Sequence, residues 1–371
     1  MTSDGHREND LWQKLKRKNI AFWGLMCILF ATVLAVFAYV IIPDPSPNAN
    51  RHMPELALLK PGHKYSVLKI PNEIYAQKSI LESLFMGFPD KFIYSPFDSI
   101  AYVKDGVNIH TSLDEDKFIS YDKLIGKSYA NLDDARMAIT SSSIEIHTSW
   151  LGTDRFGRDI LSRIILGIRI SLMAGFLAVF VSLLVGVSLG ALGGFLGGWV
   201  DNIIQYIINV VWSIPTLLLV FAIVLALGRG VAVIFIAVGL TMWVDVARLV
   251  RGLVISLGKE QFVTAARSMG QRPLTILFKH ILPNTLGPVL VITSSNFATA
   301  ILVEAGLSYL GFGIAPPAPS LGNMLNENYG YALSGNIYIA IFPALAVVIL
   351  VLAFNLLGSG LRDILDVKGN S

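Results

Sequence analysis

The sequence predicts an all-α polytopic membrane protein with six transmembrane helices and a small extracytoplasmic α+β insert between the first and second spans. Three observations predict this class. Of the 371 residues, 54% are hydrophobic and only 15% are charged, whereas soluble proteins carry about 25% charged residues. The mean hydropathy is +0.61. Six apolar stretches are each long enough to cross a bilayer. An ordinary soluble enzyme and a disordered chain are both excluded.

The first span is expected at residues 20–42, after a basic tail at residues 1–19. At about 1.5 Å per residue, this stretch crosses a hydrocarbon core of about 30 Å. A cleaved signal peptide is the alternative. The apolar run is long for that, and Pro43-Asp44-Pro45 follows without a small-residue cleavage pattern. We therefore predict a retained anchor.

The other five spans are expected at residues 170–200, 202–227, 231–244, 285–303 and 337–361, and the helix of the fourth can continue to residue 250. The second span carries a small residue at every fourth position, which lets the backbone of another helix, from this chain or a partner, approach closely. These residues are Ala174, Ala178, Ser182, Gly186, Gly190, Gly194 and Gly198. Asn209, Pro215, Pro343 and Asn355 predict kinks and interhelical hydrogen bonds, with ligand contacts as the alternative.

The distribution of Lys and Arg predicts the orientation of the spans. The tail at residues 1–19 carries five basic residues, the segment 245–284 carries six, and the segment 304–336 carries none. Basic residues concentrate on the cytoplasmic side. Both termini, including the tail at residues 367–371, and the 245–284 segment are therefore expected in the cytoplasm. Residues 43–150 and 304–336 are expected outside.

The insert at residues 43–150 is polar and contains strand signals. Residues 99–103 and 107–110 flank Asp105-Gly106, a two-residue hairpin turn, and residues 65–70 also predict a strand. Its histidines show no metal-ligand spacing. After the insert, Arg155, Asp159 and Arg163 are spaced as i,i+4 pairs opposite an apolar stripe. This pattern predicts an amphipathic helix over residues 154–168 in the outer membrane interface.

Several kinds of chemistry are missing from the sequence. It contains no phosphate-binding glycine loop, no HExxH and no serine elbow, and its single cysteine, Cys27, lies in an apolar run. The net charge of +3 does not suggest nucleic-acid binding. Asp201, Asp245 and Glu304 are expected at or near span ends, which argues against an ion-coupled carrier. Energy is therefore expected to enter from a partner.

The cytoplasmic segment at residues 259–283 is the best candidate for that entry. Residues 260–269 predict a short helix on which Phe262, Val263, Ala266 and Met269 share the apolar face. Ala265 and Ala266 leave room for close contact, and Gly270 ends the helix. A short helix with one apolar face on a water-exposed loop is expected to bind in a groove of a partner.

This segment resembles the "EAA" coupling loop of ABC-importer permeases. The matching positions are Ala265-Ala266, Gly270 and Leu282-Pro283. The acidic residue that names the loop is replaced by Thr264, and the nearest acid is Glu260. The departure removes any salt bridge expected from that position and leaves the helix itself intact.

Three further blocks resemble the dipeptide, oligopeptide and nickel branch of these permeases, specifically the C-type subunit. The similarity covers about residues 150–366. The block before the second span contains Gly152, Asp154, Gly157, Arg158 and Asp159; the outer-loop block contains Glu304, Gly306, Gly311, Gly313 and Asn323; and the third block covers residues 354–363. The insert at residues 43–150 is not covered by the resemblance.

The resemblance implies a transport subunit, not an enzyme, in the inner membrane of a bacterium. Its implied partners are a homologous B-type permease, two cytoplasmic ATPase subunits, an extracytoplasmic solute-binding protein, membrane lipid and a peptide substrate. ATP and Mg would bind the ATPase subunits, so this chain needs no cofactor. Nickel or another chelated metal is the alternative cargo. A secondary carrier, and an adhesion or signalling protein acting through residues 43–150, are the alternatives from other classes.

Overall fold

The computed structural model describes residues 19–365, except residues 74, 77, 112–115, 126–131 and 229. The tails at 1–18 and 366–371, to which a cytoplasmic location was assigned, lie outside the described residues. The chain forms two compact units. One unit comprises residues up to 33, residues 168–315 and residues from 345. The other unit comprises residues 34–167 and 316–344.

The described residues contain five helical segments long and apolar enough to cross a membrane, and six if one broken pair counts as a span. The continuous segments are α2 (Asn19–Val36), α7 (Ile160–Leu196), α10 (Val231–Leu257), Pro273–Tyr309 and α15 (Tyr338–Leu365). The segment Pro273–Tyr309 joins α12 (Pro273–Ile276), a π-helical turn η3 (Leu277–Ile281) and α13 (Leu282–Tyr309). The polytopic helical class is confirmed.

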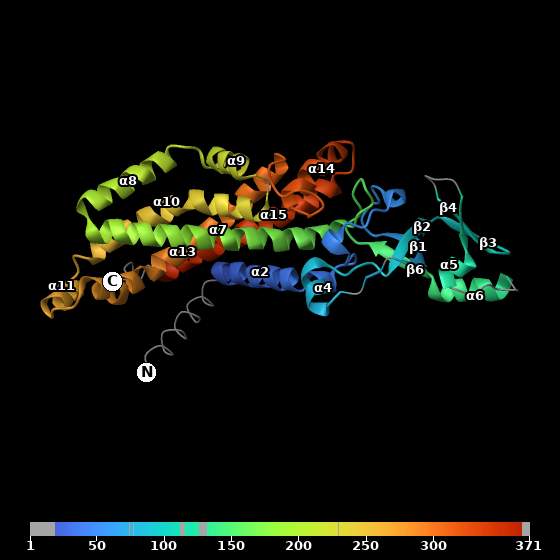
Figure 1. Ribbon diagram of the computed structural model, residues 1–371, viewed down its shortest axis with the longest axis horizontal. Helices are drawn as coiled ribbons and strands as arrows, with labels where there is room; N and C mark the ends of the chain where they lie inside the picture. Colours follow the sequence, from blue (N-terminus) through green and yellow to red (C-terminus); the bar gives the residue numbers. More distant parts are fainter. Residues whose placement is uncertain are drawn as a thin grey trace. The chain divides into compact units, whose positions relative to one another are not determined.

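The third span is broken where Pro215 predicted only a kink. Helix α8 (Gly198–Trp212) and helix α9 (Thr216–Leu227) meet at an angle of 92° (Figure 1). Proline has no amide hydrogen to donate and disfavours helix at the residue before it, so the helix stops ahead of Pro215. Helix α9 ends at Gly228, whose φ of 92° is left-handed.

The glycine row of α7 packs against α10 of the same chain (Figure 1). A Cβ atom at Gly190 would lie 2.5 Å from the carbonyl oxygen of Ala247, and one at Gly194 would lie 2.8 Å from that of Arg251. In the reverse direction, a Cβ at Gly239 of α10 would lie 2.6 Å from the carbonyl oxygen of Ala178. The small-residue row is therefore a helix contact, and the partner helix comes from this chain. Gly198 lies outside this contact.

Helices α2 and α15 form a second close pair in the same unit. A Cβ at Gly24 would lie 2.8 Å from the carbonyl oxygen of Ala353. Gly360 of α15 likewise leaves no room for a side chain beside Ala21. The first span is thus packed against the last one.

The insert contains two three-stranded antiparallel sheets. One has the order β2 (Phe92–Phe97), β1 (His63–Pro71), β6 (Ile144–Ser149), and the other β3 (Ser99–Val103), β4 (Gly106–His110), β5 (Lys117–Ser120). The predicted hairpin is β3–β4, and the predicted strand over residues 65–70 is part of β1. The turn at Asp105-Gly106 joins β3 to β4, with Val103 opposite Gly106. Leu68, Val107, Ile109 and Ile139 lie in the buried core. The remaining short elements are α3 (Ala38–Ile41), η1 (Pro47–Ala49), η2 (Pro54–Leu56), α4 (Ile80–Met86), α5 (Tyr121–Ile125), α6 (Leu132–Ser142) and α14 (Leu321–Leu333).

The prediction of an amphipathic interfacial helix over residues 154–168 is wrong. Residues 151–159 form a tight loop, and α7 begins at Ile160 and continues through the span without a break. Arg158 and Arg163 are buried rather than placed on a solvated face. The i,i+4 ion pair that forms is Asp154–Arg158. The helical pattern implied that these arginines face water. Instead, both lie close to Glu327, from a distant segment of the chain.

Candidate functional site

The helix expected in the cytoplasmic segment is α11 (Gln261–Ser268), between α10 and α12. Its inner face packs against its own chain: Val263 and Ala266 join a buried cluster. The other members of that cluster come from α7, α10, α12 and η3: Ala191, Val246, Val250, Val254, Ile276, Leu277 and Ile281. The position of α11 is therefore fixed by apolar contacts to the spans on both sides of it.

We call the exposed side chains of Phe262, Ala265 and Met269, the last at the C-terminal end of the helix, the outward face of α11. The polar residues of α11 are exposed as well: Gln261, Thr264, Arg267 and Ser268. Phe262 is 41% exposed and Met269 71% exposed, whereas Ala266 is 1% exposed. The expectation that Ala266 and Val263 share a free face with Phe262 and Met269 is therefore wrong, because the apolar arc is split between two surfaces.

Gly270 and the π-helical turn shape the segment after α11. Gly270 has a φ of 75°, the left-handed conformation that glycine adopts without strain at a helix end. His280 of η3 lies 2.9 Å from the Gln271 side-chain oxygen, measured at Nε2. Leu282 is half-buried and Pro283 exposed at the start of α13. Glu260 precedes α11, and its carbonyl oxygen accepts a hydrogen bond from the Val263 amide. The Glu260 side chain makes no capping hydrogen bond to α11.

The block before the second span folds around the buried carboxylate of Asp154. Its Oδ1 accepts hydrogen bonds from the amides of Phe156 (2.9 Å) and Arg158 (3.0 Å). Its Oδ2 accepts one from Arg158 Nε at 2.6 Å. The other end of the Arg158 guanidinium donates from Nη2 to Glu327 of α14 at 2.6 Å. Arg158 thus joins the loop before α7 to α14.

The two glycines of this block have left-handed backbone conformations, and each lies very close to another part of the chain. Gly152 has a φ of 89°, and a Cβ there would lie 2.6 Å from the Leu59 carbonyl oxygen. Gly157 has a φ of 71°, and a Cβ there would overlap the carbonyl of Met53. Both positions require glycine for conformation and for space.

The buried charge extends beyond the residues of the motif. Asp159 accepts hydrogen bonds from the amide and the hydroxyl of Ser162, and burial raises the pKa of its carboxyl above the ordinary value despite these bonds. Arg51 forms ion pairs with Asp44 and Asp90. Arg163 is buried with Nε 3.9 Å from Asp154 Oδ2, too far for a hydrogen bond. We call Asp44, Arg51, Asp154, Arg158, Asp159, Arg163 and Glu327 the charge cluster.

The outer-loop block does not lie entirely in a loop. Glu304 belongs to α13, is fully buried, and accepts hydrogen bonds from Ser171 of α7 (3.1 Å) and Ser308 (2.8 Å). Gly306 is also in α13. Gly311 follows that helix with a left-handed φ of 82°, and Gly313 leaves no space for a side chain beside Ser308. Asn323 is buried in α14.

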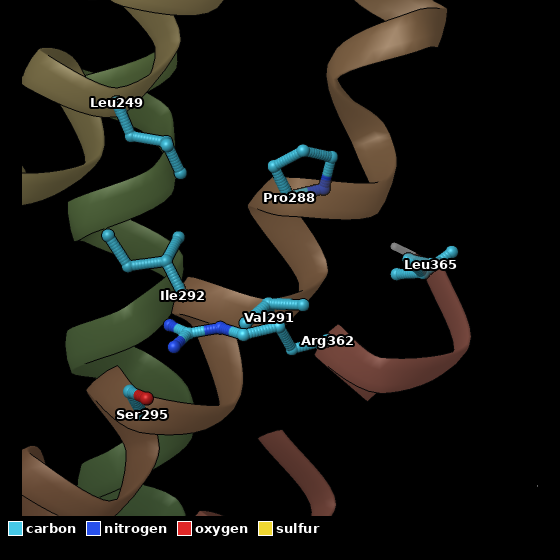
Figure 2. Close-up of a pocket in the computed structure, with 7 residues that line it drawn as sticks. All are labelled: Leu249, Pro288, Val291, Ile292, Ser295, Arg362 and Leu365. Atoms are coloured by element: carbon cyan, nitrogen blue, oxygen red, sulfur yellow. The ribbon is translucent and has the colours of Figure 1, made fainter. Parts of the chain in front are cut away.

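Two cavities in the first unit lie beside the span helices. One, of about 310 Å³, is lined by Leu249, Pro288, Val291, Ile292, Ser295, Arg362 and Leu365. Figure 2 shows Arg362 of α15 extending toward Ile292 and Ser295 of α13. The other, of about 170 Å³, lies at the break between α8 and α9. Among the described residues, no group of three or more His, Cys, Asp or Glu is placed to hold a metal ion.

Comparison with known proteins identifies the family of the helical bundle. Residues 183–368, half of the chain, match the family described as "Binding-protein-dependent transport system inner membrane component". The chain belongs to this family. It is 45% identical over 219 residues to the "Glutathione transport system permease protein GsiD" of Escherichia coli O1:K1 / APEC, and equally to that of Shigella flexneri serotype 5b (strain 8401). In both cases the match covers 59% of this chain and 72% of the relative.

Solved structures give a more distant likeness. A chain of the MetNI methionine ABC transporter, in inward-facing conformations, has a TM-score of 0.45 and 22% identity. The match covers 55% of this chain and 97% of that one. From the family and the relatives together, the protein is a multi-pass inner-membrane permease subunit of an ABC transporter and not its catalytic subunit. An ABC permease works with ATPase subunits and a partner permease.

Proposed function

We propose that the chain pairs with a homologous B-type permease to form the path through which an ATP-driven importer moves peptides. In this proposal a solute-binding protein delivers the peptide outside, and two cytoplasmic ATPase subunits drive alternating access. Both termini and α11 lie in the cytoplasm. The similarity to a glutathione permease supports a peptide-like cargo over nickel or another chelated metal. The family match, rather than the position of the acidic residues, argues against a secondary carrier.

The observation that carries the proposal is the two-sided construction of α11. Its inner face is buried against α10 and η3, while its outward face leaves Phe262, Ala265 and Met269 exposed. An amphipathic helix of this kind binds in a groove of its partner. Force applied to the outward face by an ATPase reaches two spans through apolar contacts, which is what coupling requires.

A charge on the outward face tests the coupling role. We expect Phe262→Asp to leave insertion of the chain and binding of the partner permease intact, because the changed side chain is exposed. It should release the ATPase subunits in a detergent pull-down and abolish uptake, since an unpaired charge buried in a contact costs several kcal/mol. Thr264→Asp is the matched control, with the same charge on another exposed side of α11.

Retention of the ATPases and of full uptake by Phe262→Asp would contradict the coupling role. Ala266 is unsuitable for this test, because its side chain packs inside the chain and a substitution would disturb α11 itself. The cargo is tested separately, by uptake of labelled glutathione, tripeptide and Ni²⁺ in cells with and without this chain. Loss of Ni²⁺ uptake alone would overturn the peptide assignment.

A further inference from the structure

Asp245 is an acidic residue inside a span helix, not at its end. Helix α10 runs from Val231 to Leu257, so at 1.5 Å per residue Asp245 lies about 21 Å from its first residue. The expectation that Asp245 marks a span end is therefore wrong. Its side chain is exposed in the chain, whereas the residues on either side, Val244 and Val246, are buried. Ionisable groups in spans are costly, and where they occur they mark functional sites.

The Asp245 side chain lines the cavity at the break between α8 and α9. Its other lining residues are apolar, aromatic or hydroxyl-bearing: Val211, Trp212, Ile214, Pro215, Thr216, Leu219, Thr241 and Val244. Helix α8 ends at this cavity, and a helix C-terminus carries partial negative charge. Ligand sites in membrane transporters are formed at broken helices of this kind. The N-terminus of α9 opens on the same cavity with the opposite partial charge, so the Asp245 carboxylate is the group that favours a positive charge there.

The two arginines that follow Asp245 on α10 have other contacts. Arg251 pairs with Asp201 of α8 through two hydrogen bonds of 2.5 and 2.6 Å. The Arg248 guanidinium stacks on the ring of Trp212, 4.1 Å from its centroid. No ion pair joins Asp245 to any residue that the structure describes, and the Thr241 hydroxyl donates to the Val238 carbonyl. The Asp245 carboxylate is left to bind a cation supplied from outside the chain.

We propose that this cavity binds the ammonium group at the amino terminus of a peptide in transit, with Asp245 as the charged residue. The inference rests on the proposed function, because it takes the cargo to be a peptide. A peptide amino terminus has an ordinary pKa of about 7.7–8.0 and is mostly charged at pH 7. A small cavity with one carboxylate and mainly apolar walls suits such a group, since few polar groups fix orientation in a binding site.

The test uses the whole importer, with its partner permease, ATPases and binding protein, in cells without other peptide uptake. Labelled trialanine and N-acetyl-trialanine are supplied at concentrations that saturate the binding protein, and the initial uptake rates are compared. We expect Asp245→Asn to reduce trialanine uptake by about tenfold or more, as expected for the loss of a hydrogen bond between charged groups. Uptake of the acetylated peptide should be unchanged.

Two further variants separate binding from structure. Asp245→Glu keeps the charge and should retain most of the uptake. Thr299→Val, an exposed position of α13 outside the cavity, should behave as wild type. ATP hydrolysis stimulated by the binding protein reports assembly of each variant. Wild-type trialanine uptake by Asp245→Asn overturns the proposal, as does an equal loss for both peptides. If the wild-type importer does not transport the acetylated peptide, the proposal is supported by a loss of trialanine uptake in Asp245→Asn and its recovery in Asp245→Glu. A wild-type importer that moves neither peptide refutes the proposed function, and the inference with it.

Discussion

At the residue scale, the charge cluster shows how a motif acts through partners far away in the sequence. Asp154 and Arg158 are four positions apart, but Glu327, which binds the other end of Arg158, is 169 positions from it. A buried ion pair adds little net stability compared with an apolar pair, yet removing one partner leaves an uncompensated charge. The cluster is therefore sensitive to single substitutions.

Replacing Arg158 tests this sensitivity. We expect Arg158→Leu to destabilise the protein by about 3–5 kcal/mol, because the buried Asp154 and the partly buried Glu327 would lose the cation that both bind. The purified protein should melt at a clearly lower temperature in a fluorescence-detected assay. Arg155→Leu is the control, since Arg155 is exposed in the same loop and surface substitutions change stability by about 0.5 kcal/mol or less. Equal melting temperatures for the two variants would show that the cluster is not structural.

The sequence predicted the members of the motif but not their arrangement. Helical spacing suggested pairs between Arg155, Asp159 and Arg163, because local pattern carries no information on burial by distant segments. Asp44, Arg51 and Glu327 were missed for the same reason. Asp44 and Arg51 lie in one segment and Glu327 in another, and both segments are far from the motif in the sequence. That an arginine is buried can be recognised only when the positions of its partners in the fold are known.

At the element scale, the close approach of α7 and α10 determines which substitutions the bundle tolerates. We expect Gly190→Leu to prevent folding or assembly, because even a Cβ at this position lies 2.5 Å from the Ala247 carbonyl oxygen. Gly252→Leu on α10 is the matched control, with no atom within 4 Å of its Cβ position. The amount of monodisperse protein after detergent extraction measures both. A normal yield of Gly190→Leu would contradict the packing of these two helices.

Element positions were more predictable than element geometry. Apolar length and the hairpin signal at Asp105-Gly106 predicted the spans and β3–β4, because these depend on local sequence. The 92° break at Pro215 was underestimated, since proline marks where a helix stops but not the direction of the next one. For α11, periodicity predicted an apolar arc, but only the neighbours of Val263 and Ala266 show which part of that arc is buried.

At the scale of the whole molecule, the distribution of basic residues assigns a side of the membrane to each exposed segment. The sequence similarity settles the family but leaves the orientation as a proposal. Asp105 in the β3–β4 turn, Ser334 after α14 and Lys259 before α11 are all exposed side chains. Ser320, in the same outer segment as Ser334, is fully buried and cannot report its side. Asp105 and Ser334 should face outward, and Lys259 should face the cytoplasm.

Single cysteines at these three positions test the orientation, after the native Cys27 has been replaced by alanine. In intact spheroplasts, a membrane-impermeant maleimide should label Asp105→Cys and Ser334→Cys but not Lys259→Cys. After permeabilisation, Lys259→Cys should be labelled as well, which shows that its thiol is accessible from the inner side. Labelling of Lys259→Cys in intact spheroplasts would reverse the orientation. It would also place the outward face of α11 on the side without ATP, where no ATPase can act on Phe262 or Met269.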